Sequence, residues 1–330
     1  MSGNRNFIEQ RAEHIYQVKV PLPFPLRFVN AYVVKGLEGY TVIDPGIHTA
    51  DTEACWHEAL RLMKLKYSDI QQIVLTHHHP DHYGLSGWLQ QETGAQVWMS
   101  EAGKRQVDYL WGSYRRGTVD LHHLFMLHGM ESQVGNALVE HMEDFIGLVS
   151  PHPKVSLINS NELFMLGDHK YQPIHAPGHA YGQLMFYRES SGELFCGDQV
   201  LPQITPNIGL LPLPGMDDNP LQSFLDSLAF ISTLPIKIAY PGHRDPFVGF
   251  AERCHEIIAH HRDRLDRLIV MIDEPRNAYE LCLRFFGSKL SIHQLRFAMA
   301  ETLAHLAYLR ELGKVTEVLS GNIVNYHRLD

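Results

Sequence analysis

Histidine and aspartate are concentrated in one short stretch of this sequence, THHHPDHYG at residues 76–84. If the stretch leaves a strand, His77 and His79 point to the same side, because side chains two apart in an extended segment share a face. Asp81 and His82, at the first turn of a following helix, would lie beside them and could hold a second ion. Imidazole and carboxylate ligands suit zinc and neighbouring first-row metals. Neither pair fills a tetrahedral site, so the stretch predicts further ligands elsewhere.

Three more ligand candidates each follow a predicted strand: His179 in APGHAYG, Asp198 in LFCGDQ and His243 in AYPGHRDP. Together with the histidine-rich stretch they complete two sites, which are His77, His79 and His179 in one, and Asp81, His82 and His243 in the other. The two oxygens of Asp198 can bridge both sites. Each metal then keeps an open position to share a hydroxide, so the sequence predicts a two-metal centre with this bridging hydroxide as the nucleophile.

The elements that must position these residues alternate between strand and helix. Runs of β-branched and aromatic residues predict strands at 14–20, 28–35, 39–44, 71–76, 96–99, 171–177, 182–189, 192–198 and 236–242. Apolar residues at helical spacing predict helices at 50–65 and 81–92. The alternation is typical of an α/β layered fold.

The alternation breaks in three places. Residues 102–150 have helical spacing and no strand signal, which predicts a helical insertion, and residues 201–218 form a Pro-rich loop too long for a simple connector. A helix at 249–272 ends before Pro275, which cannot continue it. Helices at 277–286 and 291–312 and a hairpin turning at 320–322 then predict a small winged-helix-like unit. We therefore expect one domain over residues 1–272 and another over 276–330.

The order of these motifs resembles a known family. His-x-His-x-Asp-His followed downstream by His, Asp and His is the signature of the metallo-β-lactamase-fold hydrolase superfamily, and the resemblance covers about residues 14–272. It implies an αββα sandwich. Asp44, in TVIDPG, resembles the family's second-strand aspartate, which supports the ligating histidines from behind. Residues 276–328 resemble the winged-helix tail of a branch that includes β-lactamase-like endoribonucleases and related thioesterases.

The identities of the candidate ligands exclude some branches of this superfamily. Flavodiiron members have Glu at the second motif position, where this chain has His79, and classical β-lactamases lack the His that follows the motif Asp, which is His82 here. The remaining group contains glyoxalase II, lactonases, thioesterases, phosphodiesterases and RNase Z-like nucleases. No glutathione-binding pattern is present, so glyoxalase II itself is not favoured.

Two residues are candidates for direct catalytic roles. The two cations outweigh Asp81, Asp198 and the hydroxide, so the centre stays positive and favours substrates that develop negative charge as they react. Asp81 is expected to accept a proton during attack and pass it to the leaving group. Tyr181, two residues after His179, is a candidate hydrogen-bond donor to the developing oxyanion, and a structural strand-end role is the alternative.

Other residues of the same types are expected to be structural. His78 and Tyr83 are not predicted ligands, and Cys196 is expected to be a small buried residue rather than a ligand or nucleophile. His260 and His261 are expected to be polar positions on the surface of the helix at 249–272.

Composition excludes several classes of function. The 330 residues carry a formal net charge of −9, which argues against a broad nucleic-acid surface, since phosphate binding needs clustered Lys and Arg. No run approaches 18 apolar residues, so no membrane helix is expected. The N-terminus has no apolar secretory region, and the four cysteines are scattered without C-x-x-C spacing. These features predict a cytoplasmic protein.

The segments that flank the ligands indicate the substrate. Residues 102–150 and 201–218 are rich in apolar side chains, which suits an apolar acyl or ring portion better than a polynucleotide. We expect a small or medium ester, thioester or lactone as substrate and zinc as the metal, with manganese or iron as alternatives. An endoribonuclease or phosphodiesterase, and a non-catalytic metal-binding regulator that uses the tail, are the competing hypotheses. For residues 102–150, a satellite helical layer or a homodimer contact is the alternative to a substrate lid.

Overall fold

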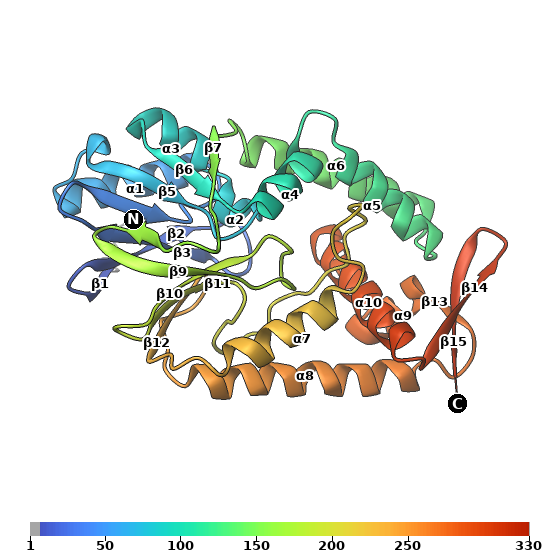
Figure 1. The fold of residues 1–330 in the computed structure, drawn as a ribbon. Helices are drawn as coiled ribbons and strands as arrows, with labels where there is room; N and C mark the ends of the chain where they lie inside the picture. Colours follow the sequence, from blue (N-terminus) through green and yellow to red (C-terminus); the bar gives the residue numbers. More distant parts are fainter. Residues whose placement is uncertain (1–6, 330) are drawn as a thin grey trace.

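Two β-sheets packed face to face form the centre of the computed structural model, which describes residues 7–329, and helices cover both outer surfaces (Figure 1). The first sheet contains, in order, β1 (Ile8–Ala12), β2 (Ile15–Pro21), β3 (Phe28–Lys35), β4 (Tyr40–Ile43), β5 (Ile70–Val74), β6 (Gln96–Met99) and β7 (Val155–Leu157). The second contains, in order, β12 (Ile238–Pro241), β11 (Glu193–Gly197), β10 (Leu184–Arg188), β9 (His169–His175) and β8 (Phe164–Leu166).

The strands are apolar on both faces because each sheet is covered on both sides. In β3, Val29, Ala31 and Val33 belong to the core under the helices, whereas Tyr32 and Val34 belong to the core between the two sheets. This is the period of two that a strand imposes on its side chains. The core between the sheets combines aliphatic side chains with five buried aromatic ones, Tyr32, Tyr171, Phe186, Phe195 and Tyr240.

Helices on the two outer faces complete the sandwich. On the first sheet, α1 (Ala50–Met63) lies against β2, and α3 (Ser86–Thr93) lies against β5 and β6. Thr49 caps α1 by accepting a hydrogen bond from the Thr52 amide, and Lys64 ends it in a left-handed conformation. Helices α7 (Pro220–Ile231) and α8 (Phe250–Val270) pack together beneath the second sheet (Figure 1). The chain therefore has the expected αββα architecture.

Three helices fill the region where the sequence predicts an insertion. They are α4 (Glu101–Trp111), α5 (Arg116–Leu127) and α6 (Ser132–Leu148), and they extend from one end of the sandwich (Figure 1). Ser100 caps α4 by accepting from the Gly103 amide. Leu121, Phe125, Leu138 and Phe145 are buried where the helices meet each other and their neighbours.

The C-terminal unit consists of two helices and a small antiparallel sheet. Its elements are β13 (Arg276–Asn277), α9 (Ala278–Phe286), α10 (Ile292–Glu311), β14 (Val315–Ser320) and β15 (Ile323–Arg328), with sheet order β13-β15-β14. Helix α10 is buried around most of its circumference, as expected of a helix enclosed by others, because it contacts α6, α7, α8 and α9. Leu303, Leu306 and Leu309 of this helix are buried, whereas Leu312, its C-cap residue, is 52% exposed.

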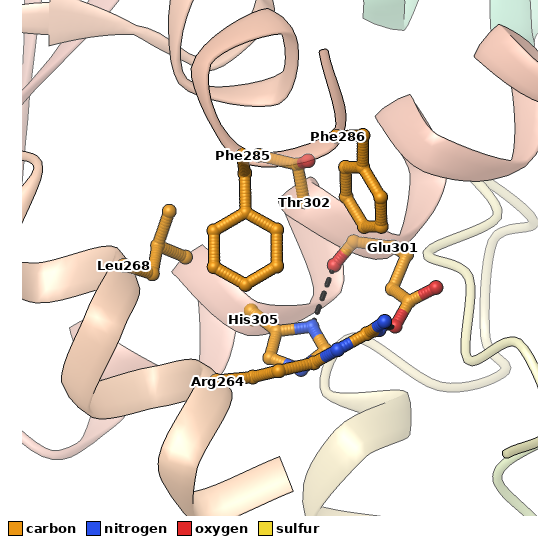
Figure 2. A pocket seen from close by; sticks show the side chains of 7 residues that line it. All are labelled: Arg264, Leu268, Phe285, Phe286, Glu301, Thr302 and His305. Carbon is orange, nitrogen blue, oxygen red and sulfur yellow. Dashed lines mark hydrogen bonds and ion pairs between the residues drawn. The ribbon is translucent and has the colours of Figure 1, made fainter. Parts of the chain in front are cut away.

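A small polar cluster joins the C-terminal unit to α8 (Figure 2). Arg264 of α8 forms an ion pair with Glu301 of α10, and its guanidinium lies 5.3 Å from the ring centre of Phe286 at the end of α9. His305 Nδ1 donates to the Glu301 carbonyl oxygen over 2.8 Å. The aromatic contact and the ion pair together satisfy the charge of Arg264 inside the interface.

One expectation about histidine is wrong. His261 is completely buried, and its Nδ1 lies 3.1 Å from Nε2 of His305, so it belongs to the α8–α10 interface and not to the surface. Helical spacing alone placed it on the polar face. The C-terminal unit covers this side of α8. The sequence pattern did not predict where that unit lies.

Several short elements were not predicted. These are β1, β7, β8 and β13, helix α7, and a 3₁₀ turn at Tyr67–Asp69. The helix predicted at 81–92 is two helices, α2 (Pro80–Tyr83) and α3, because Gly84 and Leu85 separate them. Strands of two or three residues are too short to show a period of two. Within residues 7–329, no helix has the length and apolar content needed to cross a membrane.

Candidate metal centre

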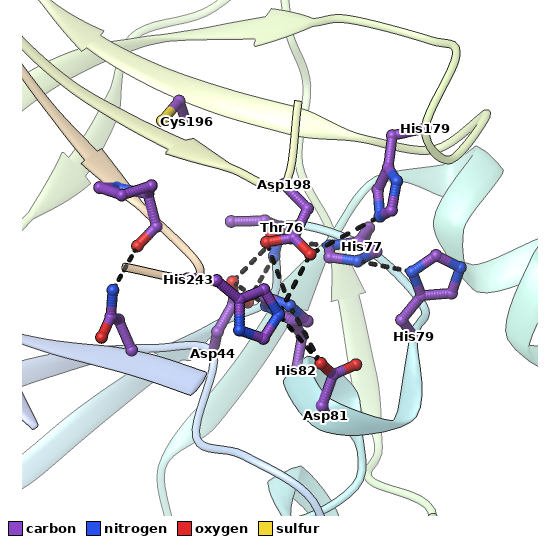
Figure 3. A network of polar contacts seen from close by, with 12 residues as sticks. Asp44, Thr76, His77, His79, Asp81, His82, His179, Cys196, Asp198 and His243 are labelled. Carbon is purple, nitrogen blue, oxygen red and sulfur yellow. Dashed lines mark hydrogen bonds and ion pairs between the residues drawn. The ribbon is translucent and has the colours of Figure 1, made fainter. Parts of the chain in front are cut away.

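The loops that follow β4, β5, β9, β11 and β12 bring eight polar side chains to one edge of the sandwich (Figure 3). They are the sequence-predicted residues Asp44, His77, His79, Asp81, His82, His179, Asp198 and His243. The pairs β4–β5 and β11–β12 are parallel, so the carboxyl ends of their strands meet at the same edge. Residues separated by more than 160 positions in the chain are therefore neighbours.

Helix α2 positions the second half of the histidine-rich stretch. His79 is its N-cap residue, and Pro80 stands at the first helical position, where its fixed φ favours the helix and its missing N–H is not needed. The His82 amide donates to the His79 carbonyl oxygen over 3.0 Å. This single turn directs Asp81 toward the solvent-facing side of the site, while His82 is fully buried.

The first group of candidate ligands contains His77, His79 and His179, whose nitrogen atoms lie within 4.8 Å of one another. His77 Nε2 and His79 Nδ1 are 3.0 Å apart. The ring centres of His79 and His179 are 4.7 Å apart. Three imidazoles converging on one point match the nitrogen ligands that zinc prefers.

The second group contains Asp81, His82 and His243, and it also lies within 4.8 Å. His243 Nε2 is 3.2 Å from Asp81 Oδ2. Asp198 stands between the two groups: its Oδ1 lies 3.4 Å from His82 Nε2, and its Oδ2 lies 3.3 Å from His243 Nε2 and 3.8 Å from His179 Nε2. Asp198 is therefore placed where a bridging carboxylate would have to be.

Two of the candidate histidines are held by the ring nitrogen that faces away from the centre. The Nδ1–H groups of His179 and His243 donate to the carbonyl oxygens of Asn207 and Phe28, both over 2.9 Å. Because a carbonyl only accepts, it holds a proton on Nδ1 of each ring, so that Nε2, which points into the site, is the nitrogen that can bind an ion. Sequence reasoning missed both carbonyl partners, since any residue type can supply a main-chain oxygen.

Asp44 organises the rings of His77 and His82. It adopts a left-handed backbone conformation, which aspartate tolerates, and accepts from the Thr76 amide over 2.8 Å and the Thr76 hydroxyl over 2.7 Å. His82 Nδ1 donates to Asp44 over 2.9 Å, and Thr76 Oγ1 lies 2.9 Å from His77 Nδ1. Asp44 thus contacts one ring directly and another through Thr76.

Gly242 leaves room for the carboxylate of Asp198, and Gly197 leaves room for the side chains of Gln183 and Thr76. A Cβ on Gly242 would lie 2.1 Å from Asp198 Oδ1 and 2.6 Å from His82 Cε1. Gly197 has φ +50°, and a Cβ there would lie 2.5 Å from Gln183 Nε2. Any larger residue at position 242 would push the carboxylate or the ring out of place.

Several buried polar atoms at this centre have no hydrogen-bond partner among residues 7–329. They are Nε2 of His82, Nε2 of His179 and Oδ1 of Asp198. A buried polar atom without a partner carries a desolvation cost of about 1–3 kcal/mol, so it is rare unless something else binds it. Lone pairs on imidazole nitrogen and carboxylate oxygen are the donors that divalent first-row metals take. The residues present therefore fit a metal centre.

The pKa shifts of these residues in the protein without metal ions also favour a metal centre. Burial acts to lower the pKa of His243, but Asp198 and Asp81 outweigh it and raise that pKa to about 10. The same carboxylates raise the pKa of His82 well above its usual value, whereas burial and neighbouring rings lower the pKa of His77 and His79. Protons on two rings thus supply the positive charge that the buried carboxylates require.

The other residues singled out in the sequence are not among these candidate ligands, although the ring centre of His78 lies 4.5 Å from that of His79. The ring of Tyr181 packs edge-on against that of His175, with ring centres 5.7 Å apart, and lines a small cavity next to His179 rather than the larger cavity described below. His78 is buried, and burial lowers its pKa to about 3. Cys196 is fully buried, and its thiol donates to the Val200 and Tyr240 carbonyl oxygens.

A cavity of about 400 Å³ opens onto the candidate ligands. His79, Asp81, His179, Asp198 and His243 form its floor. Its walls come from the β2–β3 loop, helix α6, the loop at 201–207 and helix α10, and they are largely apolar: Leu22, Phe24, Leu26, Phe145, Leu201, Ile204, Pro206 and Phe297. The insertion and the Pro-rich loop were expected here, whereas the β2–β3 loop was not.

Sequence comparison identifies the class of protein. A profile of the metallo-beta-lactamase superfamily matches residues 24–243, and a profile of the metallo-beta-lactamase-like C-terminal domain matches residues 265–328. The first match covers more than half of the chain. The chain therefore belongs to the metallo-beta-lactamase superfamily, as the resemblance in its motifs implied.

Individual relatives place it more closely. The crystal structure of a metallo-beta-lactamase family protein from Thermus thermophilus matches with a TM-score of 0.85 and 33% sequence identity, over 97% of this chain and 100% of that one. A Bacillus subtilis (strain 168) protein named "Probable metallo-hydrolase YqjP" is 26% identical over 95% of this chain and 98% of its own length. An Emericella nidulans protein named "Atrochrysone carboxyl ACP thioesterase" is 20% identical over 70% of this chain and 76% of its own. This chain is thus a metallo-hydrolase that carries the C-terminal domain as well.

Proposed function

We propose that this protein is a dinuclear metal-dependent hydrolase that cleaves a small or medium ester, thioester or lactone with an apolar acyl or ring portion. The observation that carries the proposal is the cavity, whose floor consists of candidate metal ligands and whose walls are apolar. Its volume of about 400 Å³ lies in the range of small-molecule sites. The thioesterase named among the relatives supports the ester class of bond.

Two ions would be held by the two groups of ligands described above. His77, His79 and His179 would hold one, Asp81, His82 and His243 the other, and Asp198 would contact both. When bound, divalent cations lower the pKa of water and polarise a carbonyl oxygen. The donor set suits zinc, with manganese or iron as alternatives that only the metal content decides.

Asp81 is the residue we assign to proton transfer. Its side chain is 19% exposed and lines the cavity, whereas that of Asp198 is 8% exposed and lies between three imidazoles, those of His82, His179 and His243. A carboxylate oxygen of Asp81 can therefore accept a proton during attack and deliver it to a leaving group in the cavity. The apolar walls orient the substrate and exclude bulk water. Tyr181 lines a different cavity and has no role in this proposal.

The first experiment is metal analysis followed by a substrate panel. We expect two equivalents of metal per chain and hydrolysis of p-nitrophenyl esters, acyl-CoA thioesters or lactones, lost on chelation and restored by added metal. Asp198→Ala should lose metal and activity. Asp266→Ala, which changes an exposed carboxylate on α8, is the matched control and should retain both.

Each competing hypothesis predicts a different result in the metal analysis or the substrate panel. A single equivalent of metal would refute the bridging role of Asp198. Preference for a phosphodiester, with a steep decrease in binding as salt rises, would favour a nuclease, because phosphate contacts release counterions. Metal binding without turnover of any ester, thioester, lactone or phosphodiester would favour a regulator.

A further inference from the structure

Arg296, on α10 of the C-terminal unit, lines the cavity above the candidate metal ligands. It is the only Lys or Arg among the residues that line this cavity in the described part of the chain. No carboxylate within residues 7–329 lies within 4.0 Å of its guanidinium, and its Nε is buried without a hydrogen bond. A charge in this position has no protein partner.

The environment of Arg296 differs from that of Arg264 in the same interface. Arg264 is neutralised by Glu301, so its role is structural. Arg296 instead lies over two aromatic rings, 4.2 Å from the centre of Phe297 and 5.6 Å from that of Phe145. Aromatic faces stabilise a cation but leave the edge of the guanidinium, with its N–H donors, free.

An uncompensated charge in a largely apolar cavity is costly. Burial lowers the pKa of Arg296 to about 10, which still leaves it charged at neutral pH. Asp81 acts in the opposite direction, but its carboxylate is one of the candidate metal ligands and is committed there. The structure therefore retains a half-buried cation without a protein partner, which a ligand that enters the cavity would meet.

We propose, on the basis of the hydrolase function above, that Arg296 binds a carboxylate on the part of the substrate that does not react. The preferred substrates are then esters, thioesters or lactones that carry a second, terminal carboxylate. The paired N–H donors of a guanidinium match the flat, bidentate geometry of a carboxylate. The single cation in the cavity wall balances one negative charge. A phosphate monoester carries about two negative charges at neutral pH, so one of them would remain unpaired.

The test compares two esters of equal acyl length, mono-4-nitrophenyl glutarate and 4-nitrophenyl valerate. In the wild-type holoenzyme we expect kcat/KM to be about tenfold or more higher for the glutarate, since a charge-assisted, desolvated hydrogen bond is among the strong ones. Arg296→Met should lose about 10–100-fold on the glutarate and change by less than about threefold on the valerate. Arg296→Lys should recover part of the preference. Arg262→Met, which removes an exposed cation on α8, is the control.

Calorimetric binding of glutarate and valerate to the metal-loaded protein separates this inference from the proposed function. If no ester is hydrolysed but glutarate binds more tightly and Arg296→Met abolishes the difference, the hydrolase proposal fails and the carboxylate site stands. If esters are hydrolysed without a preference for the glutarate, the carboxylate site is refuted alone. Equal losses on both esters in Arg296→Met, at unchanged metal content, would also refute it, because they would indicate a structural role.

Discussion

Asp44 supports the candidate metal ligands without facing the cavity. It accepts hydrogen bonds from the Thr76 amide, the Thr76 hydroxyl and His82 Nδ1, so both of its oxygens are used as acceptors. We predict that Asp44→Asn weakens metal affinity by about 10–100-fold, since an amide nitrogen cannot accept any of these bonds. Competition with a chromophoric chelator measures this. Asp266→Asn, at an exposed position, should match the wild type, and an unchanged affinity in Asp44→Asn would contradict the supporting role.

Gly242 provides a second test at the level of one residue. A Cβ here would overlap Asp198 Oδ1, at 2.1 Å, so Gly242→Ala should displace the carboxylate between the two groups of ligands. We expect the loss of at least one metal equivalent and about a hundredfold or greater loss of activity, because small displacements of catalytic groups are costly. Elemental analysis and circular dichroism measure metal and fold. Gly147→Ala, at an open position on α6, is the control and should behave as the wild type.

At the scale of single residues, the sequence predicts the candidate ligands better than the groups that hold those ligands in place. His77, His79, Asp81 and His82 are recognisable because ligand chemistry requires their types at fixed spacing. The carbonyl oxygens of Asn207 and Phe28 leave no trace in the sequence, since the main chain is the same everywhere. Arg296 also escaped notice, because a lone arginine on a predicted packing helix resembles any solvated charge. Tyr181, chosen for its proximity in sequence to His179, lines a different cavity.

Helices α8 and α10 form an interface with a predictable response to acid. Burial lowers the pKa of His261 to about 2 and that of His305 to about 3, whereas an unfolded histidine titrates near 6.5. Below pH 6.5 the unfolded state therefore binds protons that the folded state does not, and stability decreases as the pH falls. Each such histidine should contribute about 1.4 kcal/mol to the loss between pH 7.5 and pH 5.5.

His305→Gln should remove one of these contributions, so the difference in unfolding free energy between variant and wild type should change by that amount over the same range. Both proteins are measured by urea denaturation with saturating metal, which cancels the contribution of the metal. His255→Gln changes an exposed histidine on α8 and should follow the wild-type pH profile. A parallel profile for His305→Gln would show that His305 is not held neutral by burial.

Long elements were predicted better than short ones, although the 12-residue helix α7 was missed. The strand at 28–35 and the long helices had clear periodicity and have nearly the expected bounds, because burial on one or two faces imposes the pattern. The walls of the cavity were predicted only in part. Helix α6 and the loop at 201–207 lie next to ligand-bearing segments, whereas the β2–β3 loop and α10 reach the cavity only through tertiary packing.

The whole molecule should unfold as one unit, because α10 contacts helices of the insertion and of the outer layer as well as α9. Leu306→Ala, at a fully buried position of α10, should cost about 2–5 kcal/mol. All four tryptophans lie between residues 56 and 111, in the N-terminal half of the chain. Their fluorescence therefore reports on the unfolding of that half, whereas α10 lies in the C-terminal half. We expect fluorescence and circular dichroism to shift together in urea.

Leu312→Ala is the control, since that side chain is 52% exposed and its truncation should change stability little. An unchanged fluorescence midpoint for Leu306→Ala, with a separate early transition in circular dichroism, would mean that the C-terminal unit unfolds alone. The arrangement of the two units could not be predicted from the sequence. Amphipathic patterns identify which face of a helix is covered but not which distant segment covers it.

A short relay crosses the junction between the units. Asn207 donates to Glu301 of α10 over 2.6 Å, while its carbonyl oxygen accepts from His179. Arg264 holds Glu301 from the other side. The tail is therefore not a detachable accessory: a gene that lost it would also lose a brace for the imidazole at position 179. A different C-terminal unit would have to supply another acceptor for the Asn207 amide to keep this brace in place.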